Sequence, residues 1–440
     1  MRLAKLSILA CAAALAAMPL AACSSSSTGT ATGTGASAQT TLTYWASNQG
    51  TSIQDDQQVL GPQIAKFTQQ TGIKVNVQVI PWTTLLTQVT AATVSGKGPD
   101  VLNIGNTWSA SLQATGAFLP FTSSVMNEIG GSNRFLAGSL SATGAPGQPP
   151  TAVPLYSTAY GLYYNKAQFA AAGISGPPAT WAQFVADAKK LTTNGHWGLS
   201  LEAGQIPENI HLAFELSQQQ GGSFFNSAGK PTFDTPQNVA AIKQMIDFMQ
   251  TDKIANPSDA QYSKGTEALT DYAAGRAAMV FWQSASGSLA KLGMPASEIG
   301  VAPLPLPSPL PPGGKKITSM VAGINIAIFK DTKNLAAAEK FVKFMTSTPE
   351  QESLNSTYGS LPTVSAAYSD PAFNTPAVNT FRGILNTSAA PMPPVPAEGQ
   401  FETAVGTAII HLYASAATGT TVTDGMIGLA LSQAQQQAGG

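Results

Sequence analysis

Short apolar strands alternate with amphipathic helices along most of the chain. Residues 42–45 and the alternating run 74–80 have strand patterns, and residues 59–70 between them have a helical pattern. A second unit follows, with a helix over residues 82–94 that stops at a glycine-rich turn before the apolar strand 101–104. Repeated strand-helix alternation predicts an α/β architecture with largely parallel sheets.

Three later segments have a single apolar stripe at helical spacing: residues 181–191, 236–250 and 334–345. The first follows Thr180, whose hydroxyl is a good N-cap. Because Trp181 lies on the apolar stripe, we expect it in the core, and we assign Trp82 and Trp197 to packing as well.

The N-terminus has the pattern of an export signal. Residues 1–22 begin with two cations and continue as an apolar run that is shorter than the roughly 20 residues of a membrane-spanning helix. The sequence Leu-Ala-Ala-Cys that ends at Cys23 resembles a bacterial lipobox, which predicts lipidation of Cys23. Residues 23–40 then form a flexible, uncharged tether. The alternative is a conventional signal peptide with an incidental cysteine.

The composition of the chain argues against one class of function, nucleic-acid binding. The chain has 440 residues, 43% of them apolar, and a formal charge of -1, which is typical of a soluble globular protein large enough for two lobes. Charged residues make up only 10%, against roughly 25% in ordinary domains. A basic surface for nucleic acid is therefore excluded.

The usual catalytic and metal-binding motifs are absent from the sequence. The three histidines are far apart, and neither cysteine is expected to be free in the mature chain, so we expect no metal and no cofactor. No Gly-Lys pair is followed by Ser or Thr, and there is no Gly-x-Ser-x-Gly elbow. We expect no catalytic residues, although paired carboxylates of a glycoside hydrolase can come from any position in a fold.

Several phrases, in order, resemble one protein family. They include residues 67–75 (FTQQTGIKV), 95–101 (SGKGPDV), 161–166 (GLYYNK) and 275–279 (GRAAM), followed by Leu-Pro-Thr at residues 361–363. Their order and spacing resemble the carbohydrate-binding solute-binding proteins of ABC importers, the family that includes maltose-binding protein.

The resemblance implies a two-lobed periplasmic-binding-protein-like fold of type II that closes by hinge bending. Lobe I would comprise residues 41–152 and 318–352, and lobe II residues 153–317 and 353–440. It also implies a monomer that is lipid-anchored on the outer side of a bacterial cell membrane and delivers its ligand to a membrane permease with a separate ATPase.

The carboxyl ends of parallel strands are the usual place for ligands in α/β sheets, so we expect the site in the loops after Trp45, Ile104 and Trp282. The family pattern, carried onto this sequence, implies the following ligand-binding residues: Trp45, Ser47, Asn48, Gln49, Asn106, Thr107, Trp108, Tyr156, Ser157, Glu208, Asn209, His211, Trp282, Gln283, Met320 and Gly323.

These residue types suit a sugar, because indole rings cover its C–H faces while amides and carboxylates bind its hydroxyl groups. Scarcity of arginine argues against a phosphorylated ligand. We therefore expect a neutral sugar or oligosaccharide. A protein that binds a polyol or a glycerol phosphodiester is the alternative within transport, and a surface glycoside hydrolase is the alternative as an enzyme.

Overall fold

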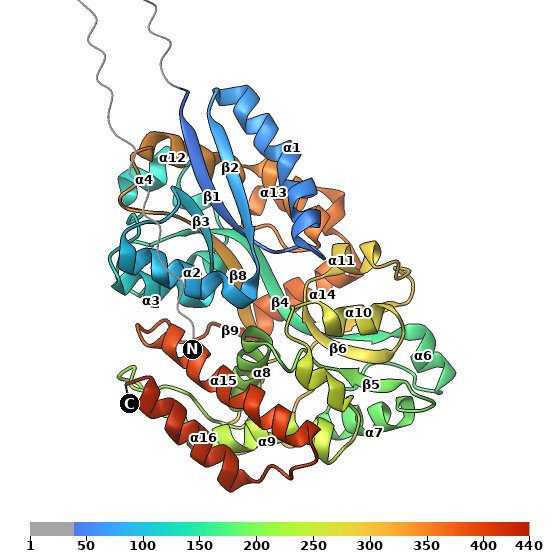
Figure 1. The fold of residues 1–440 in the computed structure, drawn as a ribbon. Helices are drawn as coiled ribbons and strands as arrows, with labels where there is room; N and C mark the ends of the chain where they lie inside the picture. Colours follow the sequence, from blue (N-terminus) through green and yellow to red (C-terminus); the bar gives the residue numbers. More distant parts are fainter. Residues whose placement is uncertain (1–38, 440) are drawn as a thin grey trace, which may run out of the picture. The chain divides into compact units, whose positions relative to one another are not determined.

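The structure is a computed structural model that describes residues 39–439 (Figure 1). The predicted signal peptide, the lipidated Cys23 and nearly all of the tether lie outside the described residues. The strands are β1 Thr41–Ser47, β2 Lys74–Ile80, β3 Val101–Gly105, β4 Val153–Asn165, β5 Trp197–Ser200, β6 Ala277–Gln283, β7 Ile299–Ala302, β8 Ser319–Ile328 and β9 Ala389–Ala390.

The α-helices are α1 Ile53–Thr71, α2 Trp82–Ser95, α3 Ser109–Ala114, α4 Ser123–Glu128, α5 Ala137–Leu140, α6 Lys166–Ala171, α7 Trp181–Leu191, α8 Ile206–Gln219, α9 Pro236–Gln250, α10 Glu267–Ala273, α11 Ser286–Lys291, α12 Leu335–Met345, α13 Thr348–Tyr358, α14 Pro376–Thr387, α15 Glu398–Ala417 and α16 Asp424–Gln437. Short 3-10 turns join them, including η1 Asn106–Trp108.

The α/β class is confirmed, but the sheet is mixed rather than largely parallel. Its strand order is β2-β1-β3-β8-β4-β6-β5. The predicted parallel pairing holds for β2-β1-β3 and for β5-β6. The long strands β4 and β8 instead pair antiparallel with each other and with β3, β6 and β7, and only the two-residue β9 pairs parallel with β8. The difference arises because β4 and β8 link the two ends of the sheet in opposite directions, whereas β-α-β units build only the ends.

Local sequence signals account for some helix boundaries. The Thr180 hydroxyl accepts a hydrogen bond from the Gln183 amide at 3.2 Å and starts α7 where predicted. By contrast, α1 begins at Ile53, six residues earlier than the apolar pattern indicated. Its first turns are polar, and Ser52 caps them by accepting from the Asp55 amide at 3.1 Å.

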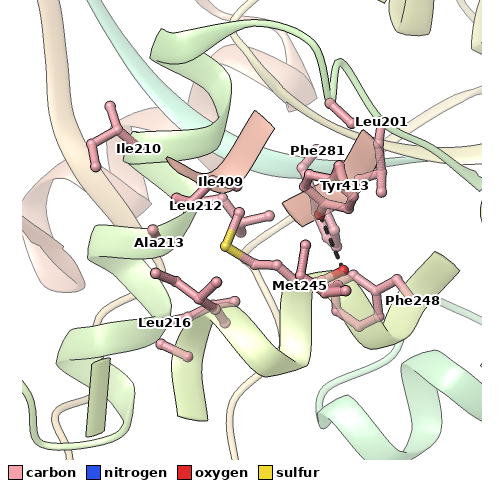
Figure 2. Packing of buried hydrophobic residues seen from close by; sticks show 14 of the residues in the cluster. Leu201, Ile210, Leu212, Ala213, Leu216, Met245, Phe248, Phe281, Ile409 and Tyr413 are labelled. Carbon is pink, nitrogen blue, oxygen red and sulfur yellow. Dashed lines mark hydrogen bonds between the residues drawn. The ribbon is translucent and has the colours of Figure 1, made fainter. Parts of the chain in front are cut away.

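Buried apolar side chains form separate clusters at the two ends of the sheet. The α1–α12 core contains Leu60, Phe67 and Phe341, and beside it the α2–β3 core contains Leu102 and Trp108. The α8–α15 core includes helices α8, α9 and α15, where the Tyr413 hydroxyl donates to the Met245 carbonyl at 3.0 Å (Figure 2). A β6–α14 core lies on the other face of β6.

Strand β8 links the clusters. Its first half contributes Met320 and Ala322 to the α8–α15 core, and its second half contributes Ile324 and Ile326 to the α1–α12 core. The strand passes from the α8–α15 core to the α1–α12 core at Gly323, so we expect the binding site near this residue. None of the helices within residues 39–439 is long and apolar enough to cross a membrane.

Candidate binding cleft

A cavity of about 1220 Å³, which includes the solvent at its mouth, lies where the ends of β1, β3 and β6 face the start of α8. We call it the cleft. Its walls are mostly polar side chains with three indole rings. The lining residues are Asn48, Gln49, Gly50, Thr51, Trp82, Gly105, Asn106, Thr107, Trp108, Thr158, Gln205, Pro207, Glu208, His211, Lys264, Gly265, Thr266, Leu269, Thr270, Trp282, Gln283, Ser284, Ala285, Ser288, Leu292, Met320, Ala322, Gly323, Ile324, Tyr358, Ser360 and Glu402.

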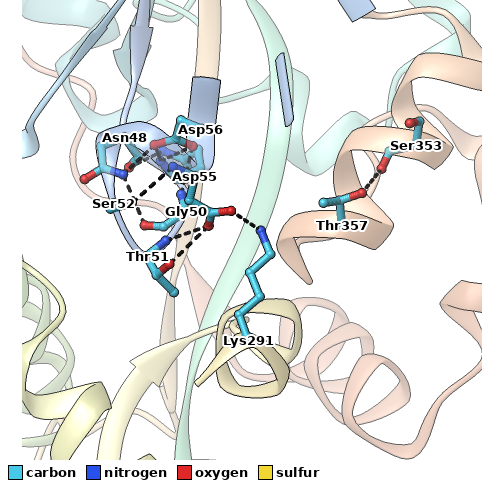
Figure 3. Close-up of polar contacts among 10 residues, drawn as sticks. Asn48, Gly50, Thr51, Ser52, Asp55, Asp56, Lys291, Ser353 and Thr357 are labelled. Atoms are coloured by element: carbon cyan, nitrogen blue, oxygen red, sulfur yellow. Dashed lines mark hydrogen bonds and ion pairs between the residues drawn. The ribbon is translucent and has the colours of Figure 1, made fainter. Parts of the chain in front are cut away.

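The first wall is the loop between β1 and α1, and Asp56 holds it. The Asp56 carboxyl is fully buried and accepts from the amides of Gln49 at 3.1 Å and Gly50 at 2.9 Å. It also accepts from the Asn48 side chain (Figure 3). Burial raises its pKa, and these hydrogen bonds oppose that effect. The loop is thus fixed in place before any ligand arrives.

Two indole rings adjoin this loop. The Trp82 indole N–H donates to the Asn48 carbonyl at 2.7 Å. The Trp108 ring lies edge-on to Trp82, with centroids 5.5 Å apart. The Trp108 ring also covers Gly105. A Cβ atom at this position would lie 3.1 Å from the ring, so glycine permits the close approach.

The second wall contains a chain of hydrogen bonds that ends at a histidine. The Thr158 hydroxyl donates to the side-chain oxygen of Gln283 at 3.0 Å, and the side-chain nitrogen of Gln283 donates to the Tyr160 hydroxyl at 2.8 Å. The Tyr160 oxygen lies 2.7 Å from His211 Nδ1. Burial lowers the pKa of His211 to about 4, so the imidazole is neutral at pH 7.

Carboxyl groups with raised pKa values lie in and behind the second wall. Burial raises the pKa of Glu208 to about 8, with a smaller contribution from the charge of Glu202. Behind it, Glu215 is fully buried; one of its oxygens accepts from the Met320 amide at 2.8 Å and the other has no partner within residues 39–439. Burial raises the pKa of Glu215 well above its usual range. This wall is therefore largely uncharged at neutral pH.

A third carboxyl group reaches the cleft from α15. Glu402 is only 2% exposed. One of its oxygens accepts from the Thr107 hydroxyl and the other from the Trp108 indole N–H, each at 2.5 Å. Because α15 belongs to the α8–α15 core and Trp108 to the α2–β3 core, these bonds join the two sides of the cleft.

Charge around the cleft is sparse. Among the described lining residues, Lys264 is the only lysine or arginine, and it is exposed at the mouth. Within residues 39–439 no group of three or more His, Cys, Asp or Glu side chains is placed to hold a metal ion. The arrangement offers hydroxyl, amide and carboxyl groups beside aromatic faces, which is the chemistry that binds polyhydroxylated molecules.

Comparison with known proteins decides the family. The model of the bacterial extracellular solute-binding protein family matches residues 50–352. The chain belongs to this family. A binding protein from Brucella abortus is 27% identical to this solute-binding protein over 276 residues, which span 62% of this chain and 64% of the relative. The match thus covers less than two thirds of that relative's length.

Solved structures agree on the fold. Maltose-bound MalE3 of T. maritima superposes with a TM-score of 0.77 and 24% identity, over 90% of this solute-binding protein and 99% of that chain. A solute-binding protein from Agrobacterium radiobacter K84 in complex with ribitol gives a TM-score of 0.77 and 24% identity, over 91% and 98%. The two-lobed type II fold expected from the sequence is thereby confirmed.

Most of the residues predicted to bind ligand lie together in this solute-binding protein. All three expected loops line the cleft. The predicted residues that line it are Asn48, Gln49, Asn106, Thr107, Trp108, Glu208, His211, Trp282, Gln283, Met320 and Gly323.

Five predicted residues lie outside the cleft lining, two of them on β1. Trp45 packs on the α2–β3 core, since successive β1 side chains alternate between the faces of the sheet. Ser47 is buried and accepts from Asn103 at 3.1 Å and from Gln49 at 3.0 Å. Ser47 therefore supports Gln49 from behind.

The other three predicted residues make contacts within the fold instead of lining the cleft. Tyr156 is buried edge-on to Tyr358 at 5.7 Å. Ser157 pairs through its backbone with Leu361, and the Asn209 side chain donates to the Ala203 carbonyl at 2.8 Å. Ser157 and Asn209 are each next to a cleft residue along the chain, Thr158 and Glu208, but do not themselves line the cleft.

Sequence reasoning missed two prominent residues of the cleft. Trp82 was assigned to packing, yet it follows β2 directly, so the rule that selected the loops after Trp45 and Ile104 also indicates it. Glu402 had no such signal. It lies in helix α15 near Phe401 and Val405, and only the tertiary fold brings it to Trp108.

Proposed function

We propose that this chain is an extracytoplasmic solute-binding protein that captures a neutral sugar or oligosaccharide and delivers it to an ABC import permease with a separate ATPase. The observation that carries the proposal is the cleft itself, where Trp82, Trp108 and Trp282 stand among amide and hydroxyl side chains. Indole rings provide apolar faces for sugar C–H groups, and the polar groups fit the hydroxyl groups.

The charge of the cleft supports an uncharged ligand. Phosphate and carboxylate ligands favour arginine partners, and no arginine is among the described lining residues. The two similar structures contain maltose and ribitol, which are both uncharged polyhydroxylated molecules. The lipid anchor on Cys23, the monomeric state and the lobe boundaries given above belong to the same proposal.

Ligand capture requires no covalent step. We propose that a sugar binds one wall first and gains contacts from the other wall as the cleft closes. The difference in affinity between open and closed forms then shifts the population to the closed form.

A thermal-shift panel of neutral mono- and oligosaccharides, polyols and sugar phosphates tests the proposal. A ligand that binds only the native state raises the melting temperature, so at least one neutral sugar should stabilise the protein. Stabilisation by sugar phosphates alone, or by no member of the panel, would contradict the proposal. Incubation with oligosaccharide should yield no hydrolysis product, and product formed at enzymatic rates would favour the glycoside hydrolase.

Matched tryptophan variants locate the site. Trp82 and Trp197 are both half-buried, but only Trp82 lines the cleft. We expect Trp82→Ala to weaken sugar binding roughly tenfold or more by calorimetry and Trp197→Ala to leave it within about twofold. Equal losses would place the sugar elsewhere.

A polyol is the second candidate, and the ribitol-bound structure favours it. An acyclic polyol presents no flat ring face, so Trp82→Ala should reduce its affinity much less than that of a pyranose. The same two variants therefore separate the two ligand classes.

A further inference from the structure

Glu402 connects two parts of the molecule that have separate cores. The residues next to it on α15, Phe401 and Val405, belong to the α8–α15 core. Its carboxyl oxygens bind Thr107 and Trp108 of η1, on the opposite wall. Of the described residues of α15, only Glu402 lines the cleft. A change in the distance between the walls must therefore break or form these two hydrogen bonds.

The two neighbouring indole rings differ in what holds them. Trp82 donates to the Asn48 carbonyl, which lies on its own wall, so its orientation does not depend on closure. Trp108 donates to Glu402 from the facing wall. An indole has a single N–H donor, so Trp108 loses its hydrogen bond whenever the walls separate.

We propose that Glu402 is a positioning residue that couples closure of the cleft to the orientation of the Trp108 ring. When the walls meet, the carboxyl group fixes the ring edge and the Thr107 hydroxyl, so the Trp108 ring, which is only 3% exposed, is held against Trp82 only in the closed form. Because the ring is then aligned at no further entropic cost, the ligand binds the closed form more tightly. This inference rests on the proposed function, since it concerns how the same cleft holds its ligand.

A matched control lies one helical turn away on α15. Glu398 is fully buried like Glu402, but neither of its oxygens has a well-formed hydrogen bond to the described residues, and it does not line the cleft. Burial and the adjacent Glu402 carboxyl raise the pKa of Glu398 well above its usual range. Glu398→Gln therefore replaces this carboxyl group with an uncharged group of similar shape.

The first experiment follows the Trp108 ring in the sugar-saturated protein, in which the cleft is closed. Indole N–H resonances are recorded by NMR in the full folded chain, with Trp108→Phe to assign the Trp108 signal. Under saturating sugar, Glu402→Gln should move that signal and increase its exchange with solvent, while Glu398→Gln should leave both unchanged. An unmoved Trp108 signal in sugar-saturated Glu402→Gln would overturn the proposal.

The second experiment uses the sugar found in the thermal-shift panel. Glu402→Gln should weaken binding roughly tenfold or more, mainly through faster dissociation, because it weakens two hydrogen bonds to a carboxyl group. Glu398→Gln should stay within about twofold. Wild-type affinity in Glu402→Gln, or equal losses in both variants, would overturn the positioning role. A panel without any ligand would instead count against the proposed function.

Discussion

The two walls of the cleft differ in how their carboxyl groups are stabilised. On the first wall, Asp56 is enclosed by donors from its own loop, two of them backbone amides. On the second wall, burial raises the pKa of Glu208 to about 8. Behind it, burial raises the pKa of Glu215 well above its usual range, and one Glu215 oxygen has no partner among the described residues. Hydrogen bonds thus preorganise the first wall, whereas protonation stabilises the second, so the two walls should respond differently to substitution and to pH.

Removal of the Asp56 carboxyl should have the largest effect. Asp56→Ala leaves the Gln49 and Gly50 amides and the Asn48 side chain without their acceptor in a buried loop. Loss of a buried acceptor with several donors should lower the free energy of unfolding by about 2 to 4 kcal/mol. Chemical denaturation measures this loss, and sugar affinity should fall with it because the loop lines the cleft.

A surface aspartate provides the control for Asp56. Asp252 pairs with Lys189 at 2.9 Å on the protein surface. Asp252→Ala should change the free energy of unfolding by about 0 to 1 kcal/mol, as for exposed ion pairs in general. If Asp56→Ala costs no more than this, the first wall is not organised by its carboxyl group.

The difference between the walls also explains how far the sequence could predict the site. Loops that follow strand ends are readable, and Asn48, Asn106 and Gln283 were found in this way because chain position fixes the sheet edge. The direction of a side chain was harder to read, as Ser157 and Asn209 illustrate, since a shift of one residue moves it to another face.

Long-range contacts could not be read from the sequence, and strand direction could be read only within the β-α-β units. Glu402 meets Trp108 across 294 positions of sequence, which no local pattern encodes. For the same reason, the sequence indicated the helices α7 and α9 with their bounds but not the antiparallel direction of β4 and β8. Local propensity determines the elements, whereas their pairing depends on contacts between distant segments.

Stability should depend on pH through the second wall. The pKa of Glu208 is about 8 in the folded protein, above the 4.5 of a free side chain. The folded state therefore holds this proton more tightly, so the stability it provides is complete below pH 4.5 and is lost as pH rises to about 8. Glu208→Gln keeps the group neutral and should make the decline of the melting temperature between pH 5 and pH 9 shallower, by a few degrees.

The melting temperature of Glu208→Gln should still fall between pH 5 and pH 9, because burial also raises the pKa of Glu202 to about 7 and that of Asp259 to about 8. The His211 shift has the opposite sign and acts below pH 6.5, where it reduces stability as pH falls toward 4. Asp234→Asn, at an exposed position, is the control and should leave the profile unchanged. A Glu208→Gln profile identical to that of the wild type would mean that this wall is already ionised at neutral pH.

The smallest effect is expected at the rim, where an ion pair joins α11 to the start of α1. Lys291 pairs with Asp55 at 2.5 Å, with side chains 35% and 12% exposed (Figure 3). Burial alone would raise the pKa of Asp55, but its bonds to Lys291 and Thr51 hold that pKa below its usual value. Because α11 packs in the β6–α14 core and α1 in the α1–α12 core, this pair also spans the mouth between the walls.

Lys291→Met should favour the open cleft only slightly, since exposed ion pairs contribute about 0 to 1 kcal/mol. We expect a sugar affinity two- to fivefold weaker at low salt, and a slightly larger radius of gyration by X-ray scattering without sugar. Salt screens exposed pairs, so the affinities of wild type and variant should converge near 1 M salt. Lys189→Met removes an exposed pair away from the cleft and should change neither quantity. If Lys291→Met weakened binding as much as Glu402→Gln, the rim rather than the buried carboxyl group would control closure.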